Sequence, residues 1–197
     1  MVLIGITGGI GSGKTCIAKV LEKMNYPVFY SDFEAKKLYS SNHELKKKLK
    51  HIVGSEVYKD GVFQKDFLAK RIFSNPNLKE QISGLVHPLV REEFRKWANK
   101  QTTELVFNEA AILFETGSNQ HFDAIILVVA PIEIRIDRVM QRDNLTREKV
   151  LERMEHQWPD NEKIKRSPFI IQNDGRPILN QIEKIVLEIE RLSSNEN

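Results

Sequence analysis

The feature that most constrains the fold of this chain is a run of glycines within residues 8–13, set between an apolar stretch and an amphipathic one. The apolar stretch, Val2 to Thr7, is typical of a short strand buried on both faces. Beyond the glycines, four apolar residues recur at i, i+3, i+4 and i+7, on one face of a helix that packs against a sheet: Ile17, Val20, Leu21 and Met24. A second apolar run follows at residues 27–30, so the order strand, loop, helix, strand predicts a βαβ unit with a right-handed crossover.

The loop contains the residue types that phosphate binding requires. Residues 8–15, GGIGSGKT, fit the Walker A pattern of two glycines five positions apart followed by Lys and Thr. Backbone N–H groups can form an anion nest at the start of the helix, where the Lys14 ammonium reaches the β- and γ-phosphates and the Thr15 hydroxyl ligates Mg²⁺. A chance glycine turn is the alternative, and average residue usage gives such a match in roughly one random chain in a hundred. The predicted nucleotide-phosphate site, with Thr15 as metal ligand, consists of Gly9, Ile10, Gly11, Ser12, Gly13, Lys14, Thr15 and Cys16.

The rest of the chain alternates strands and helices, apart from one helical stretch. Apolar runs predict strands at residues 105–109, 123–129 and 169–172, and helical patterns cover residues 131–142, 146–157 and the segment after Pro177. Residues 34–101 show several short helical segments and no buried strand, with Pro88 interrupting one helix near its start. This order predicts an α/β fold with a mainly parallel sheet of about five strands, flanked by helices and carrying a helical insertion.

Composition and charge argue against several classes of protein. Basic residues outnumber acidic ones only by 30 to 27, a formal charge of +3, which is too small an excess to argue for a nucleic-acid partner. No apolar stretch approaches the roughly 18 residues that span a membrane, and no basic segment precedes the first apolar run, so neither a membrane span nor a signal peptide is expected. The single cysteine fits a reducing compartment. We expect a cytoplasmic monomer in which Cys16 packs in the first turn of a helix, the alternative being a reactive thiol.

Two carboxylates follow predicted strands. Asp32 comes just after residues 27–30, and ligands of open α/β sheets bind beyond the carboxyl ends of strands. Its carboxylate could therefore accept a hydrogen bond from an attacking hydroxyl, or it could instead cap a helix that starts near Glu34. Glu109 ends the strand at residues 105–109, where it could hold Mg²⁺ through water or simply lie exposed to solvent. The sequence does not decide between the two roles of Glu109.

Arginines gather in the segment that follows the strand at residues 123–129. Arg138 and Arg142 lie four positions apart and so share a helix face, with Arg135 and Arg153 nearby in sequence. Phosphoryl transfer spreads negative charge over the equatorial oxygens, and a lid that carries arginines can stabilise that charge. A solvated face is the ordinary role of helix arginines, but the phosphate loop favours a lid. The predicted organisation is a nucleotide-binding core of residues 1–33, 102–134 and 168–197, a substrate-side insertion of residues 34–101, and a lid with its following helix at residues 135–167.

These motifs occur together, in this order, in one family. The chain resembles the dephospho-coenzyme A kinases over nearly its full length. The resemblance lies in IGITGGIGSGKT at residues 4–15, Asp32, FLAKRIFSNPNLKEQISGLVHPLVREEF at 67–94, ILFETG at 112–117, RVMQRDNLT at 138–146, RMEHQ at 153–157 and IIQNDG at 170–175. The glycine loop is shared by many P-loop proteins, whereas the block that runs into His87-Pro88 is much more specific.

The resemblance implies a P-loop kinase fold and an enzyme that uses ATP and Mg²⁺. The reaction it implies is phosphorylation of the ribose 3′-hydroxyl of dephospho-CoA, the last step of coenzyme A synthesis. It implies that Asp32 is the catalytic base and that Arg138 and Arg142 are lid arginines. His87 would lie in the substrate-binding part, although a buried structural histidine is an equal alternative. Asn173 would lie near the adenine of ATP.

Three positions depart from the family pattern. Tyr30 stands where the family commonly has the first Asp of Asp-x-Asp, Gln64-Lys65 replace an Asp-Arg pair, and Ala111 replaces a proline. These departures bear on substrate affinity, while the loop, Asp32 and the lid arginines favour activity. The alternatives are another nucleoside or nucleotide kinase of the same architecture, and a nucleotide-binding regulatory module without transfer activity. A guanine-reading Asn/Thr-Lys-x-Asp motif is absent, which counts against a GTPase.

Overall fold

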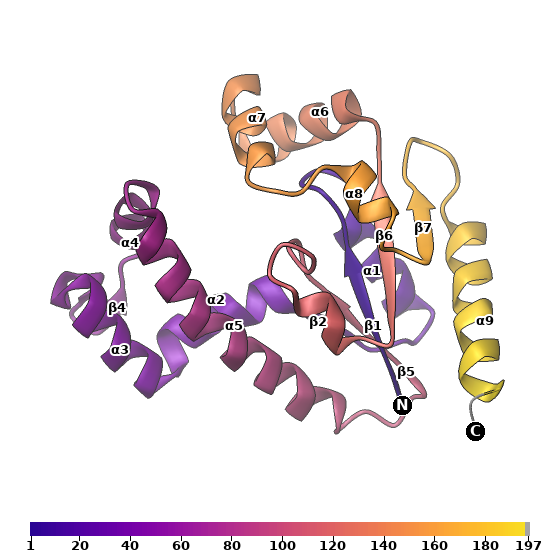
Figure 1. The fold of residues 1–197 in the computed structure, drawn as a ribbon, viewed down its shortest axis with the longest axis horizontal. Coiled ribbons are helices and arrows are strands. Elements are labelled where there is room, and N and C mark those ends of the chain that lie inside the picture. The colour runs from indigo at the N-terminus through magenta and orange to yellow at the C-terminus, as the bar shows by residue number, and fades with distance from the viewer. Residues whose placement is uncertain (196–197) are drawn as a thin grey trace. The chain divides into compact units, whose positions relative to one another are not determined.

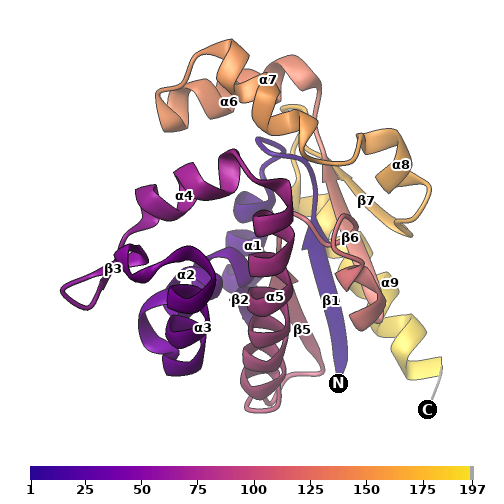
Figure 2. The same ribbon diagram turned by 60° about the vertical axis from the view of Figure 1, so that its left-hand side comes forward.

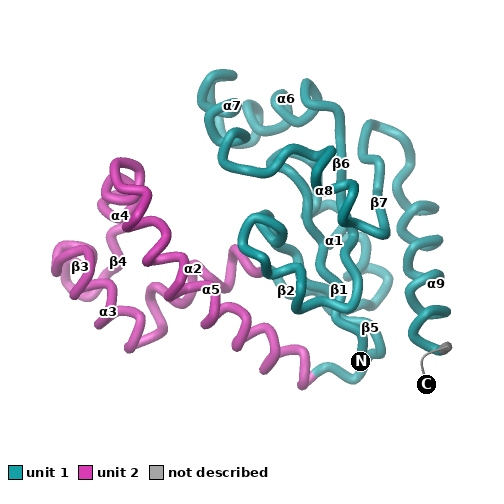
Figure 3. The backbone as a smooth tube through the Cα atoms, in the orientation of Figure 1, with its two compact units in different colours: residues 1–30, 101–197 teal, residues 31–100 magenta. Residues whose placement is uncertain are grey.

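The computed structural model, drawn in Figure 1, describes residues 1–195 and divides into two compact units. Residues 1–30 join residues 101 onward in unit 1, and residues 31–100 form unit 2 (Figure 3). Within residues 1–195, no helix combines the length and the apolar character needed to cross a membrane.

Unit 1 is built on a five-stranded parallel sheet. Its strands, in spatial order, are β2 (Val28–Tyr30), β5 (Leu105–Glu109), β1 (Val2–Thr7), β6 (Ala124–Val129) and β7 (Phe169–Gln172). β1 lies at the centre of this order, between β5 and β6. All five strands lie where the sequence predicts them, and the predicted α/β fold is confirmed.

One face of the sheet is covered by α1 (Lys14–Lys23) and α9 (Leu179–Asn195). Ile4 and Ile6 of β1 are fully buried on this side. The buried residues of the two helices recur every three or four positions, as on an amphipathic helix: Ile17, Ala18, Leu21, Ile182, Ile185, Val186 and Ile189. The helix predicted after the glycine loop is therefore held on the sheet by its apolar face.

The other face is covered in part by the segment after β5, which includes a short 3-10 helix, Ser118–His121. Gly5 faces this side, because a Cβ at that position would overlap the side chains of Ile125 and Leu113. Leu113 and Phe114 are buried there against Ile125. Glycine at position 5 thus lets this segment approach β1 closely, and β1 is covered on both faces as its unbroken apolar run predicts.

Two helices follow β6. Helix α6 (Ile132–Asp143) ends at Asn144, whose φ of 51° is left-handed, and α7 (Arg147–Glu155) begins three residues later. The two helices share a small apolar core of fully buried side chains: Ile136, Val139 and Val150. A shorter helix, α8 (Asp160–Ile164), then leads into β7. The helices predicted in this region are therefore present.

Unit 2 is mainly helical (Figure 2). Its elements are α2 (Ser31–Ser41), α3 (His43–Val53), the 3-10 turn Ser55–Val57, β3 (Tyr58–Lys59), β4 (Val62–Phe63), α4 (Lys65–Phe73) and α5 (Pro76–Ala98). The antiparallel pair of β3 and β4 was not predicted from the sequence. Asp60 and Gly61 connect the two strands with positive φ values of 50° and 83°, as in a tight hairpin turn.

Pro88 does not interrupt a helix, contrary to the sequence prediction. Helix α5 runs through it from Pro76 to Ala98. Proline cannot donate a hydrogen bond to the carbonyl four residues earlier, and its ring crowds that carbonyl. Here that residue is Gly84, which is exposed, so water is available to its carbonyl in place of the bond that proline cannot donate. Buried residues on both sides of Pro88, Val86 and Val90, keep the helix packed.

Candidate phosphate-binding site

The glycine loop leads from the end of β1 to the start of α1. Gly11 and Gly13 have φ values of 79° and 95°, which a residue with a Cβ adopts only with strain. A Cβ at Gly11 would also overlap the backbone of Arg135, and one at Gly13 would overlap the side chain of Asn173. Helix α1 begins at Lys14, directly after Gly13, so the positive end of its dipole adjoins the loop. This geometry is suited to binding an anion.

Lys14 lies inside the loop. Its side chain is buried, and Nζ donates hydrogen bonds to the carbonyls of Gly8 at 3.0 Å and Gly9 at 3.4 Å. Its positive charge is thus held where phosphate oxygens would enter the loop. Thr15 and Cys16 follow in the first turn of α1, and both are exposed. The expectation that Cys16 packs in the first turn of the helix is therefore wrong, because the apolar buried face of α1 starts at Ile17.

Arg138 of α6 contacts the loop. Its guanidinium donates to the carbonyls of Gly11 at 3.4 Å and Asn173 at 3.2 Å. Asn173 in turn donates from its side-chain amide to the carbonyl of Ser12 at 2.8 Å. The segment after β7, the loop and α6 are therefore joined by hydrogen bonds, which bring together the predicted site residues Gly11, Ser12, Arg138 and Asn173.

Arg142 does not contact the loop. It is exposed and pairs with its neighbour Asp143, with Nε 2.8 Å from Oδ1. Asp143 also accepts from Arg153 of α7 at 3.0 Å. The hydrogen bonds from Arg142 hold the pKa of Asp143 below its ordinary value, with a smaller contribution from the charge of Arg153. Of the two predicted lid arginines, the structure places Arg138 at the loop and Arg142 on a solvated helix face.

Glu109 and Tyr30 end neighbouring strands. They are paired in the register of β5 and β2. Glu109 is only 7% exposed, so its alternative role as a solvent-exposed strand end is wrong. The Tyr30 hydroxyl donates to Oε2 of Glu22 at 2.9 Å. Burial, this bond and the charges of Glu22 and Glu109 raise the pKa of Tyr30 above its ordinary value.

The described residues contain no ready-made metal cage. Within residues 1–195, no group of three or more His, Cys, Asp or Glu side chains could hold a metal ion. Mg²⁺ commonly takes one or two protein oxygens and completes its coordination with phosphate oxygens and water. The exposed Thr15 hydroxyl, next to Lys14 at the start of α1, is an oxygen ligand of the kind that such an ion uses. The residues present therefore fit a magnesium ion that arrives with the nucleotide.

Asp32 and His87 both belong to unit 2. Asp32 is exposed in the first turn of α2, which starts at Ser31. The proposed capping of a helix near Glu34 is therefore wrong, because Asp32 already lies inside the helix. His87 of α5 is partly buried, and burial lowers its pKa, helped by the charge of Arg91 and opposed by that of Asp32. The two predicted substrate-side residues are thus close enough for Asp32 to act on the ionisation of His87.

Sequence reasoning assigned no role to Gln157, which contacts the loop directly. Its Oε1 accepts a hydrogen bond from the N–H of Ile10 at 2.6 Å, and its Nε2 donates to the carbonyl of Ala111 at 3.2 Å. The partners Ile10 and Gln157 are 147 positions apart, so no local pattern indicates the contact. Its only signal in the sequence is its place at the end of the RMEHQ stretch, residues 153–157.

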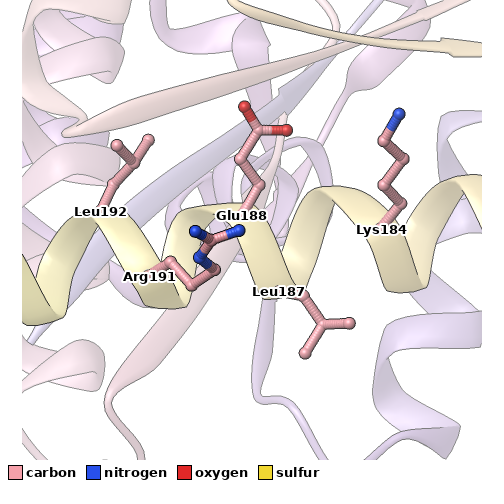
Figure 4. A pocket seen from close by; sticks show the side chains of 5 residues that line it. All are labelled: Lys184, Leu187, Glu188, Arg191 and Leu192. Atoms are coloured by element: carbon pink, nitrogen blue, oxygen red, sulfur yellow. The ribbon is translucent and has the colours of Figure 1, made fainter.

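A surface hollow beside α9 contains none of the predicted site residues (Figure 4). Its lining comes from α9 alone: Lys184, Leu187, Glu188, Arg191 and Leu192. A depression along a single helix offers no convergent polar groups of the kind that bind a small molecule. The candidate site is therefore the glycine loop and its surroundings.

Comparison with known proteins gives a consistent result. The family described as dephospho-CoA kinase matches residues 2–178. A dephospho-CoA kinase from Bacteroides fragilis is 40% identical over 185 residues, which cover 93% of this chain and 90% of the relative. A crystal structure from Thermus thermophilus superposes with a TM-score of 0.84 at 34% identity, covering 96% of both chains. The dephospho-CoA kinase of Campylobacter jejuni has the same fold, with a TM-score of 0.70 at 24% identity over 97% of this chain and 98% of the other.

Proposed function

This chain belongs to the dephospho-CoA kinase family, and we propose that it carries out the family's reaction with the phosphate loop and the charged residues around it. The enzyme transfers the γ-phosphate of ATP to the ribose 3′-hydroxyl of dephospho-CoA and so forms coenzyme A, the last step of its synthesis. The observation that carries the proposal is the glycine loop at the start of α1, with Lys14 inside it and Arg138 and Asn173 bound to it.

Lys14 and Arg138 are proposed to stabilise the transferred phosphoryl group. Both cations lie at the loop, one within it and one against its carbonyls. Preorganised positive charge is worth most in phosphoryl transfer, because the enzyme has little covalent chemistry to perform. Arg142 can join them only if its ion pair with Asp143 opens. Asn173, which binds the loop through Ser12, supports the proposed adenine site beside it.

Asp32 is proposed as the catalytic base. It follows the last residue of β2 by two positions, and its carboxylate is exposed and able to accept the proton of the acceptor hydroxyl. His87, whose lowered pKa favours the neutral form at neutral pH, is proposed to bind substrate beside it. A neutral imidazole adds no second positive charge next to Arg91.

Magnesium is proposed to bind with ATP, held on the protein side by the Thr15 hydroxyl. The ion would supply charge neutralisation for the β- and γ-phosphates. The chain's own contribution is the position of Thr15 next to Lys14 at the start of α1. Glu109, buried at the end of β5, is the candidate for a contact through water.

A monomeric state and a cytoplasmic location stay predictions. The molar mass of the purified protein, measured by light scattering, checks the first. The location of a tagged copy in fractionated cells checks the second.

The reaction is tested by incubating the purified chain with Mg-ATP and dephospho-CoA and following coenzyme A by mass. We expect a product heavier by one phosphoryl group, formed at about 1–100 turnovers per second. Adenosine, nucleosides and nucleotides serve as competing acceptors. Preferential phosphorylation of one of them would make the chain a different kinase of this fold, and ATP binding without any product would contradict the transferase function.

A further inference from the structure

The peptide units around Ile10 in the phosphate loop are held at two places by side chains from distant parts of unit 1. The N–H of Ile10 donates to Oε1 of Gln157 at 2.6 Å. The carbonyl of Ile10 accepts from Nε of Arg135 at 2.9 Å. Gly9 and Gly11 flank Ile10, and glycine lets the backbone adopt conformations closed to other residues. Because of that freedom, the hydrogen bonds to Ile10 add to those that Lys14 makes to the Gly8 and Gly9 carbonyls in fixing the conformation of the loop.

The segment that carries Gln157 is itself anchored. We call residues 157–163 the strap. The backbone N–H of Trp158 donates to Oε1 of Glu115 at 2.9 Å, and Nζ of Lys163 lies 2.7 Å from the same oxygen. Lys163 is fully buried, and the carboxylate of Glu115 is its ion-pair partner. The strap is therefore fixed to the segment that follows β5.

The strap also supports the second contact of Ile10. Asp160 accepts from Nη1 of Arg135 at 2.9 Å, and this arginine is only 8% exposed. The charge of Asp160 thus holds Arg135 in the orientation from which its Nε binds the carbonyl of Ile10. Gln157 is tied on its other side to the carbonyl of Ala111. Both groups that hold Ile10 are consequently placed by the strap.

We propose that Gln157 is a positioning residue for ATP, which acts by fixing the Ile10 peptide so that the N–H groups of the loop stay directed at the phosphates. The inference rests on the proposed phosphate-binding function of the loop. Gln157 itself need not touch ATP. Loss of its two hydrogen bonds lets the loop adopt other conformations, and ATP must then select the competent one, which weakens apparent affinity.

The test replaces Gln157 by Met, which keeps the length of the side chain and removes both hydrogen bonds. Gln181→Met is the matched control, because the side-chain amide of Gln181, like that of Gln157, makes two hydrogen bonds to backbone groups. Its Oε1 accepts from the N–H of Gln172 at 2.9 Å, and its Nε2 donates to the carbonyl of Gln172 at 3.0 Å. We expect Gln157→Met to raise the KM and the calorimetric Kd for ATP by about 3- to 10-fold, the range of a lost hydrogen bond. The KM for dephospho-CoA should stay unchanged, and the control should change neither constant.

Amide hydrogen exchange gives an independent readout. Exchange in Gln157→Met should accelerate in the peptide that contains residues 8–13 and in the strap, and stay as in the parent protein over α9.

A second variant, Gln157→Asn, keeps the amide but is one carbon too short to reach both partners. It should weaken ATP affinity as well, and it serves as the test if the Met variant does not fold. Unchanged ATP affinity in a folded variant, or equal losses for both substrates, would overturn the inference. Because calorimetry measures ATP binding without turnover, its outcome is separate from the test of the kinase reaction.

Discussion

Lys14 is the residue on which the charge of the phosphate loop depends. Its ammonium is buried and bonded to two loop carbonyls, so it is held in place before any phosphate arrives. A charge that is already positioned costs no reorganisation during the reaction, which is why such groups contribute strongly to phosphoryl transfer. Lysine at this position was predicted from the sequence, because the Walker A pattern fixes it by spacing alone.

Replacing Lys14 by Ala is expected to lower kcat by about 100-fold or more, the cost of one preorganised charge contact. Steady-state kinetics with Mg-ATP measures the change. Lys19→Ala is the control, since Lys19 is exposed on the same helix α1. A Lys14→Ala enzyme with near-parent turnover would contradict the assignment of the phosphate loop.

Replacing Asp32 by Asn is expected to lower kcat by about 100- to 10,000-fold, the typical contribution of a general base, while ATP still binds. Asn keeps the shape of the side chain but cannot take up the proton. Asp66→Asn is the control, because Asp66 is also an exposed acidic residue in the first turn of a helix of unit 2. Turnover and ATP titration together decide the matter: an Asp32→Asn variant with normal turnover would remove Asp32 from the role of base.

At the scale of helices and strands, the sequence predicts best where an apolar run decides the structure. The bounds of β1, β5 and β7 are those predicted, because each is a short apolar run with a clear end. The β3–β4 hairpin was missed because strands of two residues show no periodicity, although its Asp60-Gly61 turn is a known hairpin signal. The continuous α5 was missed because proline normally ends a helix. Contacts such as that of Gln157 with Ile10 depend on how elements pack, which no local pattern records.

The ion pair that joins α8 to the segment after β5 should be important for stability. Glu115→Ala would leave the fully buried ammonium of Lys163 without its partner. We expect a loss of about 3–5 kcal/mol in the free energy of unfolding, as for other broken buried pairs. Urea denaturation followed by circular dichroism measures it.

The double variant Glu115→Leu with Lys163→Met tests the reason for that loss. It removes both charges and keeps similar volume, so most of the stability should return. A double variant as unstable as Glu115→Ala would show that packing, and not the unpaired charge, accounts for the effect.

At the scale of the whole molecule, unit 1 carries the loop and its supports, while Asp32 and His87 belong to unit 2. The predicted organisation places Asp32 with the phosphate loop in the core of residues 1–33, whereas the boundary between the two units lies between Tyr30 and Ser31. That Asp32 and the phosphate loop act in one reaction stays a proposal. The family match across residues 2–178 covers all of unit 2 and most of unit 1, so both belong to the same enzyme.

Ligand binding should therefore be visible in the stability of the whole protein. ATP at 100 times its Kd stabilises a folded protein by about 2.7 kcal/mol, which for a chain of this size raises Tm by roughly 5–10 °C. Thermal denaturation with and without Mg-ATP measures the shift. Lys14→Ala should reduce it, and an unchanged Tm for the parent protein at millimolar ATP would contradict nucleotide binding.

The central position of β1 has a consequence for how the chain acquires its structure over time. β1 is synthesised before both of its neighbours, and they are supplied by residues 105–109 and 124–129. Pairing across such a sequence separation is slow, because a long loop must close before the contacts form. During synthesis the apolar residues of β1 therefore stay without their partner strands until more than half of the chain has left the ribosome. The strand that leads into the phosphate loop is among the first segments synthesised, but it can pair on both of its edges only after β6 has been synthesised. Nascent chains stalled before residue 124 should therefore be those that most need a chaperone.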